Sequence, residues 1–249
     1  MKALGLYGAP FAGIFSFQQG LRDILPDTQI IHVGSGPLVS YLPLAEAWIY
    51  LHEEGREHIP ELLASGKAAV CRSLPLIQLG LPAVHIDDEL AARRLAEHQI
   101  QQGARSLHYW GLPATFSHRR SRGVRAAAQA ASLPFFEHPD LESTVTALSA
   151  SGQDRIGFIG MNDQWCHQVA AALHTKNIAI PQKVLLAGFD NITPPDAPWS
   201  IPLTTVILPI REQGQLAAQL LSADQPIPVK VHLTTPPTMI VRSSTSPDQ

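Results

Sequence analysis

The chain has 249 residues, of which 45% are hydrophobic and 16% are charged, and this composition excludes disorder over most of its length. The length suits one large α/β unit or two subdomains of ordinary size. The 18 basic and 21 acidic residues give a formal net charge of −3, so we expect no nucleic-acid binding by this chain alone.

The first part of the chain alternates short apolar strands with short helices. Helices are predicted at 18–25 and at 57–65, where Ile59 and Leu62 follow helical spacing and Gly66 ends the second helix. The proline-bounded segment 36–46 has room for at most two turns of helix. Strands are predicted at 3–7, 28–33, 47–51, 68–71 and 83–86.

The signals are stronger from residue 87 onward. Asp88 is predicted to cap a helix that buries Leu95 and Ile100 and ends at Gly103. The continuous apolar run 184–189 predicts a strand buried on both faces. Further strands are predicted at 106–110, 155–159, 229–233 and 239–241. Further helices are predicted at 119–131, directly after Asn162 and Asp163, and at 210–221. The proline-rich stretch 193–202 is predicted to be a loop. This alternation predicts an α/β protein with two doubly wound parallel sheets.

The motifs of common catalytic, cofactor and metal sites are absent from the sequence. The run 34–36 follows a strand but lacks the third glycine of a dinucleotide-binding loop. His52 and His58 are separated by six positions, whereas a zinc-binding helix needs a separation of four. Neither Cys71 nor Cys166 has a nearby histidine to activate it. We therefore expect no enzyme, no catalytic residue, no cofactor and no metal ion.

Membrane and redox signals are also weak. The early apolar run 3–17 is interrupted by glycines and by Pro10, and no other run reaches the roughly 18 apolar residues that a membrane helix needs. The two cysteines lack the spacing of a redox or metal motif. They predict buried thiols in a reducing cytoplasm.

Three polar positions follow predicted strands, where open α/β sheets bind their ligands. Arg120 has a planar guanidinium that can hold two neighbouring hydroxyls, or it forms a surface salt bridge. Of Asn162 and Asp163, one is a natural helix N-cap, so only the other is expected to reach a ligand. Asp190 comes directly after an apolar strand and is either a ligand contact or a turn former.

Aromatic residues accompany these polar positions. Phe189 and Trp165 offer apolar faces close to them in the sequence. An acid, an amide, an arginine and an aromatic face are what a neutral polyhydroxyl ring needs for binding. Arg119, Arg122 and Arg125 form a basic cluster with Arg120, but the surrounding chain is acidic, so we expect a special function for no more than one or two of these arginines.

Five runs of the sequence stand out together: HIDDE (85–89), RSRGV (120–124), IPQKVLLAGFDN (180–191), PLTTV (202–206) followed by Gly214, and IVRSST (240–245). In their order and spacing they resemble the ligand-binding domain of the lactose/galactose-repressor family of transcriptional regulators. The run YWGLP (109–113) and the short first half resemble in particular the xylose-operon regulators, in which this domain precedes an AraC-type DNA-binding domain.

The resemblance implies the periplasmic-binding-protein type I fold, in which three crossovers join two subdomains around a small effector. The N-terminal subdomain is expected to comprise 1–86 and 207–236, and the C-terminal subdomain 87–206 and 237–249. By matching position, the resemblance implies that Arg120, Asn162 and Asp190 contact the effector and that Phe189 forms a wall of the cleft. The loop 8–13 contains no recognisable contact residue, so the N-terminal half of the pocket is not predicted.

The implied function is a sensor without catalysis. A neutral monosaccharide, with a pentose such as xylose as the first expectation, would bind and alter DNA binding by a domain that is not in this chain. The implied protein is a cytoplasmic homodimer. The alternative is a periplasmic sugar-binding protein of a transport system, which has the same fold but needs an export signal and is not expected to end in the run VRSST (241–245).

Overall fold

The chain folds into two compact units. The computed structural model describes residues 1–11, 13–150, 152, 155–192, 201–223, 227 and 232–246. Unit 1 comprises Met1–Ile86 and Pro209–Pro236, and unit 2 comprises Asp87–Leu208 and Pro237–Gln249. The chain thus passes between the units three times, and the second passage follows Leu208 rather than the expected position 206.

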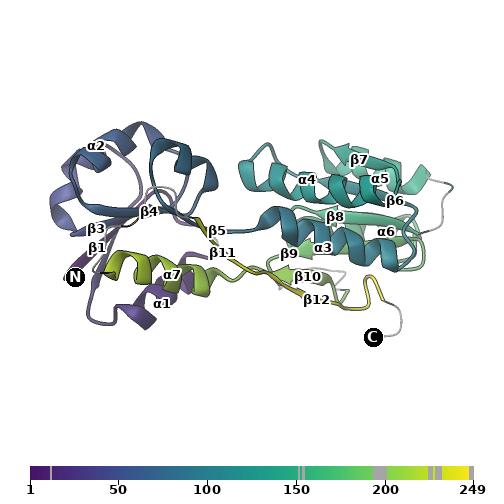
Figure 1. The fold of residues 1–249 in the computed structure, drawn as a ribbon. Helices are drawn as coiled ribbons and strands as arrows, with labels where there is room; N and C mark the ends of the chain where they lie inside the picture. The colour runs from purple at the N-terminus through teal and green to yellow at the C-terminus, as the bar shows by residue number, and fades with distance from the viewer. Residues whose placement is uncertain are drawn as a thin grey trace. The chain divides into compact units, whose positions relative to one another are not determined.

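Unit 1 contains the N-terminus of the chain (Figure 1) and is built on a six-stranded parallel sheet with the strand order β2-β1-β3-β4-β5-β11. Its strands are β1 (Ala3–Tyr7), β2 (Gln29–Val33), β3 (Ala47–Tyr50), β4 (Ala68–Cys71), β5 (Ala83–Ile86) and β11 (His232–Thr235). Its helices are α1 (Ile14–Ile24), α2 (Ile59–Ala64) and α7 (Ile210–Ser222), with 3-10 turns η1 (Leu38–Ser40), η2 (Leu42–Leu44), η3 (Arg56–His58) and η4 (Leu74–Leu79). Helices α1 and α7 cover one face of the sheet, and α2 lies on the other.

Both faces of this sheet are apolar because side chains alternate along each strand. Leu4 and Leu6 pack with α1 and α7, whereas Trp48 packs on the opposite face with α2. Helices α1 and α7 touch closely, since a Cβ atom at Gly214 would lie 2.2 Å from the backbone oxygen of Phe17. A glycine is therefore needed where these two helices meet.

The strands predicted in the first part of the chain are present, and segment 36–46 contains only η1 and η2, as predicted. Helix α1 begins at Ile14, earlier than the predicted start at residue 18. The residues Ile14, Phe17 and Leu21 have the spacing of one helix face that packs on the core, so the apolar pattern extends to the observed start, and Phe15 beside it is 65% exposed. The predicted strand 229–233 is observed as β11, and residues 229–231 lie outside the described residues.

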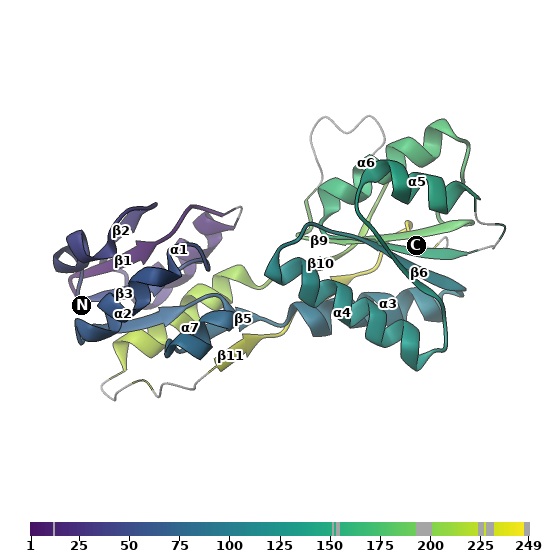
Figure 2. The same cartoon turned by 90° about the horizontal axis from the view of Figure 1, so that it is seen from above.

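Unit 2 is built on a second six-stranded sheet, with the order β7-β6-β8-β9-β10-β12. Its strands are β6 (Ser106–Trp110), β7 (Phe135–His138), β8 (Ile156–Gly160), β9 (Val184–Phe189), β10 (Thr204–Ile207) and β12 (Thr238–Ile240). Its helices are α3 (Asp88–Gln101), α4 (Thr115–Ala130), α5 (Leu141–Ala150) and α6 (Asp163–Thr175). Figure 2 shows α3 and α4 on one face of this sheet and α5 and α6 on the other.

The core of unit 2 lies on both faces of its sheet. One cluster joins Leu107 and Phe189 to α3 and α4, and the other joins Phe158 and Leu186 to α5 and α6. Every residue of β9 is buried, so the prediction of a strand covered on both faces is confirmed. Helices α3 and α4 pack through Gly123, where a Cβ atom would lie 2.2 Å from the backbone oxygen of Glu89.

Some elements of unit 2 differ from the prediction. Strand β12 is antiparallel to β10 in an otherwise parallel sheet. Strands β7 and β10 and helix α5 were not predicted; β7 is an edge strand with the exposed residue Phe136, which masks its apolar pattern. Helix α4 starts at Thr115 rather than at 119. Most of the predicted loop 193–202 lies outside the described residues.

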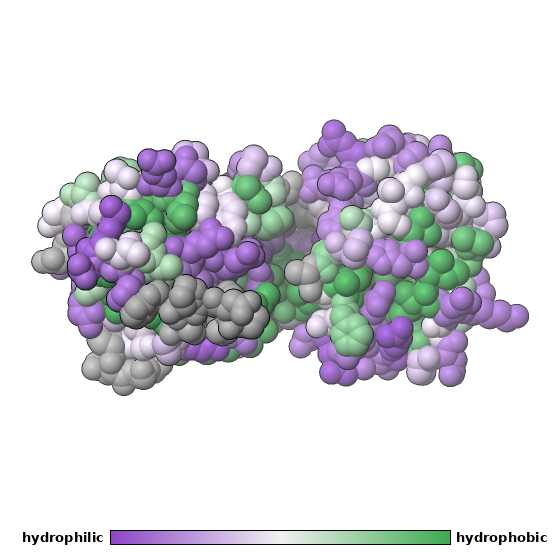
Figure 3. Space-filling model, turned by 180° about the vertical axis from the view of Figure 1, so that it is seen from behind, coloured by the Kyte–Doolittle hydropathy of each residue, from purple (hydrophilic) through white to green (hydrophobic). Residues whose placement is uncertain are grey.

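Figure 3 shows hydrophilic residues over much of the visible face, with hydrophobic residues between them. The most exposed large apolar side chains are Phe15, Val39, Leu44 and Ile192. Single exposed apolar residues are ordinary on protein surfaces. Among the described residues, no helix combines the length and the apolar character that crossing a membrane requires.

Candidate ligand-binding site

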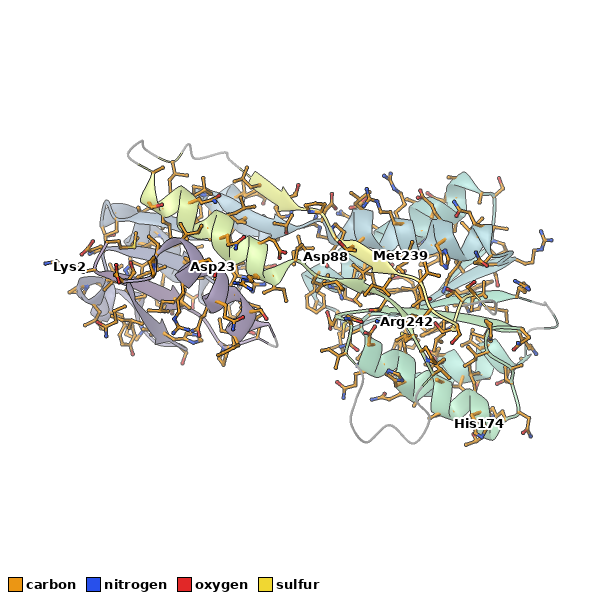
Figure 4. The ribbon with its side chains drawn as sticks, turned by 90° about the horizontal axis from the view of Figure 1, so that it is seen from below. Lys2, Asp23, Asp88, His174, Met239 and Arg242 are labelled. Atoms are coloured by element: carbon orange, nitrogen blue, oxygen red, sulfur yellow. The ribbon has the colours of Figure 1, made fainter. Side chains whose placement is uncertain are left out.

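The candidate site lies at the edge of the unit 2 sheet where β6, β8 and β9 end. These strands are parallel, so their carboxyl ends meet at one edge. Helix α4 follows β6 and carries Arg120, Met161 directly follows β8, and Asp190 directly follows β9. Helix α3 begins at Asp88, which Figure 4 labels at the amino end of that helix. Residues distant in the sequence thus converge at this edge.

Arg120 is the centre of the site. Its side chain is buried, and its Nε and one Nη each lie 2.8 Å from Oδ1 of Asp88. The other Nη donates a hydrogen bond of 2.5 Å to the carbonyl of Met161. The guanidinium lies over the ring of Phe189, 4.1 Å from its centroid, and 5.2 Å from the ring centroid of Phe116. The salt bridge considered as the alternative role of Arg120 is present, and it is buried.

Asp88 was predicted to cap α3, and this prediction is wrong. The residue that caps the helix is Asp87, whose side chain accepts a hydrogen bond of 3.0 Å from the amide of Leu90. Asp88 is the first residue of the helix itself and turns inward to Arg120. The N-cap is the residue directly before the first helical residue, and its side chain accepts a hydrogen bond from a free amide of the first turn. Asp87 is in that position and Asp88 is one residue too late.

Asp190 is half-buried next to Arg120, whereas the ring of Phe189 is fully buried in the core of unit 2. The backbone of Asp190 has φ 97°, in the left-handed region that favours glycine. Strained residues of this kind cluster at functional sites. Burial raises the pKa of the Asp190 carboxyl, the charge of Arg120 lowers it, and the charge of Asp88 raises it. Within the described part of the chain, no hydrogen bond reaches the Asp190 carboxylate, so it can accept one from a ligand.

Asn162 and Trp165 have local structural roles. Asn162 caps α6, because its Oδ1 accepts a hydrogen bond of 3.0 Å from the amide of Trp165. The Trp165 ring packs against Trp110 with ring centroids 4.0 Å apart. Asp163 is engaged as well, with its carboxylate bound by Thr205. The structure therefore brings Arg120, Phe189 and Asp190 together, and it places Asn162 and Trp165 at the same sheet edge as a cap and a packing residue.

Unit 1 has a polar cluster of its own that the sequence did not indicate. Arg72 follows β4, and its guanidinium lies 3.5 Å from the ring centroid of Phe11, in the loop after β1. Its Nε donates a hydrogen bond of 3.0 Å to Oε1 of Gln213. His52, after β3, contacts the carbonyl of Ala9 at 2.8 Å, and burial lowers its pKa. The sequence signal that could have indicated this cluster is a polar or aromatic residue shortly after each of three strands: Phe11 after β1, His52 after β3 and Arg72 after β4.

The sequence matches the family model of the periplasmic binding protein-like domain over residues 96–245. This match covers more than half of the chain, so the chain belongs to that family. No curated protein matches the chain.

Solved structures share the whole fold. A regulatory protein of the LacI family from Chloroflexus aggregans is similar with a TM-score of 0.80 and 19% identity, over 97% of this chain and 98% of that one. A LacI-family transcriptional regulator from Enterococcus faecium with bound ribose has a TM-score of 0.74 and 20% identity over 99% of each chain. The transcriptional regulator CelR in complex with cellobiose has a TM-score of 0.79 and 20% identity, over 98% of this chain and 84% of that one. The predicted fold class is confirmed.

Proposed function

We propose that this chain is the effector-sensing domain of a transcriptional regulator of the lactose/galactose-repressor family and that its effector is a small neutral sugar. The observation that carries the proposal is the half-buried Asp190 carboxylate, which is held beside Arg120 and Phe189 with no hydrogen-bond donor among the described residues. A sugar hydroxyl is a suitable donor for a carboxylate.

The charges at the site favour a neutral ligand over a phosphorylated one. The positive charge of Arg120 is paired with Asp88, and Asp190 adds a further negative charge beside this pair. A phosphate would require at least two cationic partners to balance its charge. We expect a pentose such as xylose first, and the ribose and cellobiose bound by the two relatives support a sugar as the ligand class.

The relatives support a regulator more than a transport protein. Each of the three is described as a regulator. At a net charge of −3, these 249 residues are not suited to hold DNA, so we infer that another domain contacts DNA and that the regulator acts as a cytoplasmic homodimer. The alternative is a periplasmic sugar-binding protein of a transport system, which has the same fold. The sequence of the complete protein separates the two, because only the regulator needs a DNA-binding domain.

The test is a thermal-shift screen followed by titration calorimetry. A ligand that binds only the folded form raises the melting temperature. We expect D-xylose, D-ribose or another pentose or hexose to raise it, and D-ribose 5-phosphate to leave it unchanged. A response to the phosphate alone would contradict the neutral ligand class. No response to any sugar would overturn the sensor proposal without affecting the fold. Salt-sensitive DNA binding in a mobility assay would contradict the need for another domain.

A further inference from the structure

Asp163 is a buried acid that serves neither as the cap of α6 nor as an open ligand contact. Its side chain is 2% exposed. Its Oδ1 and Oδ2 lie 2.8 Å and 3.0 Å from Oγ1 of Thr205, on β10, which donates the hydrogen bond. Oδ2 also accepts a hydrogen bond of 2.9 Å from the amide of Ile192. The carboxylate thus joins the start of α6 to β10 and to the chain that follows β9.

The segment bound in this way is the turn that carries Asp190. Asp190 and Asn191 both have left-handed backbones, with φ 97° and 54°. Neither is a glycine, so this turn persists only if its surroundings hold it. The Asp190 amide donates to the carbonyl of Val206 at 2.9 Å, and the Asn191 amide donates to Oγ1 of Thr205 at 3.2 Å. The Ile192 amide donates to Asp163, so two of the three amides of this turn, those of Asn191 and Ile192, are held by the pair Asp163 and Thr205.

The neighbouring strand leaves space for this carboxylate. A Cβ atom at Gly188, on β9, would lie 2.4 Å from Oδ1 of Asp163 and 3.0 Å from Sγ of Cys166. A glycine at this position therefore lets Asp163 lie against β9, one residue before the strand ends at Phe189. Arg242, labelled in Figure 4, donates a hydrogen bond of 2.6 Å to Oδ1 of Asn191 from the C-terminal segment.

We propose that Asp163, acting with Thr205, is a positioning residue that holds the turn Asp190–Ile192 and thereby aims the Asp190 carboxylate at the ligand. The part that concerns the ligand rests on the proposed function. Asp163 itself does not touch the ligand in this proposal, because both of its oxygens are engaged by the protein. It acts through the backbone of the turn.

The charges around Asp163 make this role depend on pH. The pKa of Asp163 is raised to about 7, because burial and the charge of Asp190 raise it more than the bonds from Thr205 and Ile192 and the charge of Arg242 lower it. Cys166 faces the acid from the next turn of α6 as a buried thiol. An ionised carboxylate is a stronger acceptor than a protonated one. The turn should therefore be held more firmly at pH 8 than at pH 6.

The first experiment measures amide hydrogen exchange in the protein without ligand. In Asp163→Asn, an amino group replaces one carboxylate oxygen and the charge is lost, so the remaining oxygen is a weaker acceptor for Thr205 and the Ile192 amide. We expect exchange of the Asn191 and Ile192 amides to become at least tenfold faster in Asp163→Asn and in Thr205→Val. Thr144→Val, which removes a buried hydroxyl from α5, is the matched control and should leave the turn unchanged. Unchanged protection of both amides in either folded site variant would overturn the proposal.

The second experiment measures affinity for D-xylose and D-ribose by titration calorimetry at pH 6 and pH 8. We expect wild-type affinity to be higher at pH 8, and Asp163→Asn to bind about tenfold more weakly with a smaller dependence on pH. Wild-type affinity in Asp163→Asn, at both pH values, would contradict the positioning role. If neither these sugars nor any other in the panel binds the wild type, the proposed function fails, and amide exchange still decides whether Asp163 holds the turn.

Discussion

Arg120 and Asp88 form a buried ion pair in which two nitrogens of the guanidinium lie 2.8 Å from the same carboxylate oxygen. The pair joins α4 to the first residue of α3, and it leaves the flat face of the guanidinium against the ring of Phe189. The charge of the arginine is therefore balanced inside unit 2 before any ligand arrives. This is the reason for expecting an uncharged ligand.

Breaking this pair should cost much more stability than breaking an exposed pair beside it. Asp88→Ala leaves a buried guanidinium without its partner, and we expect a loss of about 3–5 kcal/mol in the free energy of unfolding. Glu89→Ala breaks the exposed pair between Glu89 and Arg122 on the same two helices, and it should cost less than about 1 kcal/mol. Urea unfolding of both variants measures the difference. Equal losses would show that burial does not strengthen the Arg120 pair.

Removing the Asp190 carboxylate should weaken sugar binding and leave the fold intact. Asp190→Ala leaves the ligand hydroxyl without its acceptor, which costs roughly 1–3 kcal/mol, or about tenfold to a hundredfold in affinity. Arg120→Ala should weaken binding at least as much, with a loss of stability as well. Titration calorimetry with D-xylose or D-ribose measures the effect, and Glu97→Ala, an exposed change on α3, is the control. Unchanged affinity in both site variants would remove Asp190 and Arg120 from the site.

The cap of α6 should affect stability through one hydrogen bond. Asn162→Ala removes the acceptor of the Trp165 amide and should cost about 0.5–2 kcal/mol in the free energy of unfolding. Asn162→Asp keeps a capping oxygen and should cost less. Thermal unfolding of the two variants tests the role. A larger loss of stability in Asn162→Asp than in Asn162→Ala would contradict the capping role. The cap remains in Asn162→Asp, so a lower sugar affinity of this variant would show that Asn162 also contacts the ligand.

The buried His108, paired with the half-buried His138, should make unit 2 less stable as the pH falls. His108 and His138 share a hydrogen bond of 2.9 Å on neighbouring strands, and burial, with a smaller effect of His138, lowers the pKa of His108 to about 4 from 6.5. Between these values the unfolded chain binds a proton at His108 that the folded chain does not, so stability falls as the pH falls from 6.5 toward 4.

The test of the histidine pair is a difference between variants. Asp163 acts in the opposite direction, because its pKa is raised from 3.8 to about 7 and the folded chain binds the extra proton between those values. We therefore compare the free energy of unfolding of His108→Phe with that of the wild type at pH 7 and pH 5. Between pH 7 and pH 5 the wild type should lose more stability than His108→Phe. Replacement of the exposed His118, the control, should leave the loss of stability the same as in the wild type. An equal loss in the wild type and His108→Phe would contradict this assignment.

Local sequence patterns determined most of the framework. The apolar run of β9 predicted a strand buried on both faces, and the spacing of Ala92, Leu95, Ala96 and Ile100 predicted α3. Burial and periodicity depend on residues close together in the chain. Elements at the edge of the framework were missed or misplaced. Strand β7 exposes Phe136, so its apolar residues do not alternate between a buried and an exposed face, and in the first turn of α1 the exposed Phe15 lies between Ile14 and Phe17, which pack on the core.

The candidate site was predicted in its position but not in its contacts. Residues that follow parallel strands must meet at one sheet edge, so Arg120 and Asp190 were found from the order of the elements. Which acid of the pair Asp87 and Asp88 turns inward, and which oxygen binds Thr205, depends on packing between helices and strands that are far apart in the chain. The sequence by itself determined which side chains are available at that edge, and only the tertiary structure decided their partners, because hydrogen-bond geometry is set by the packed backbone.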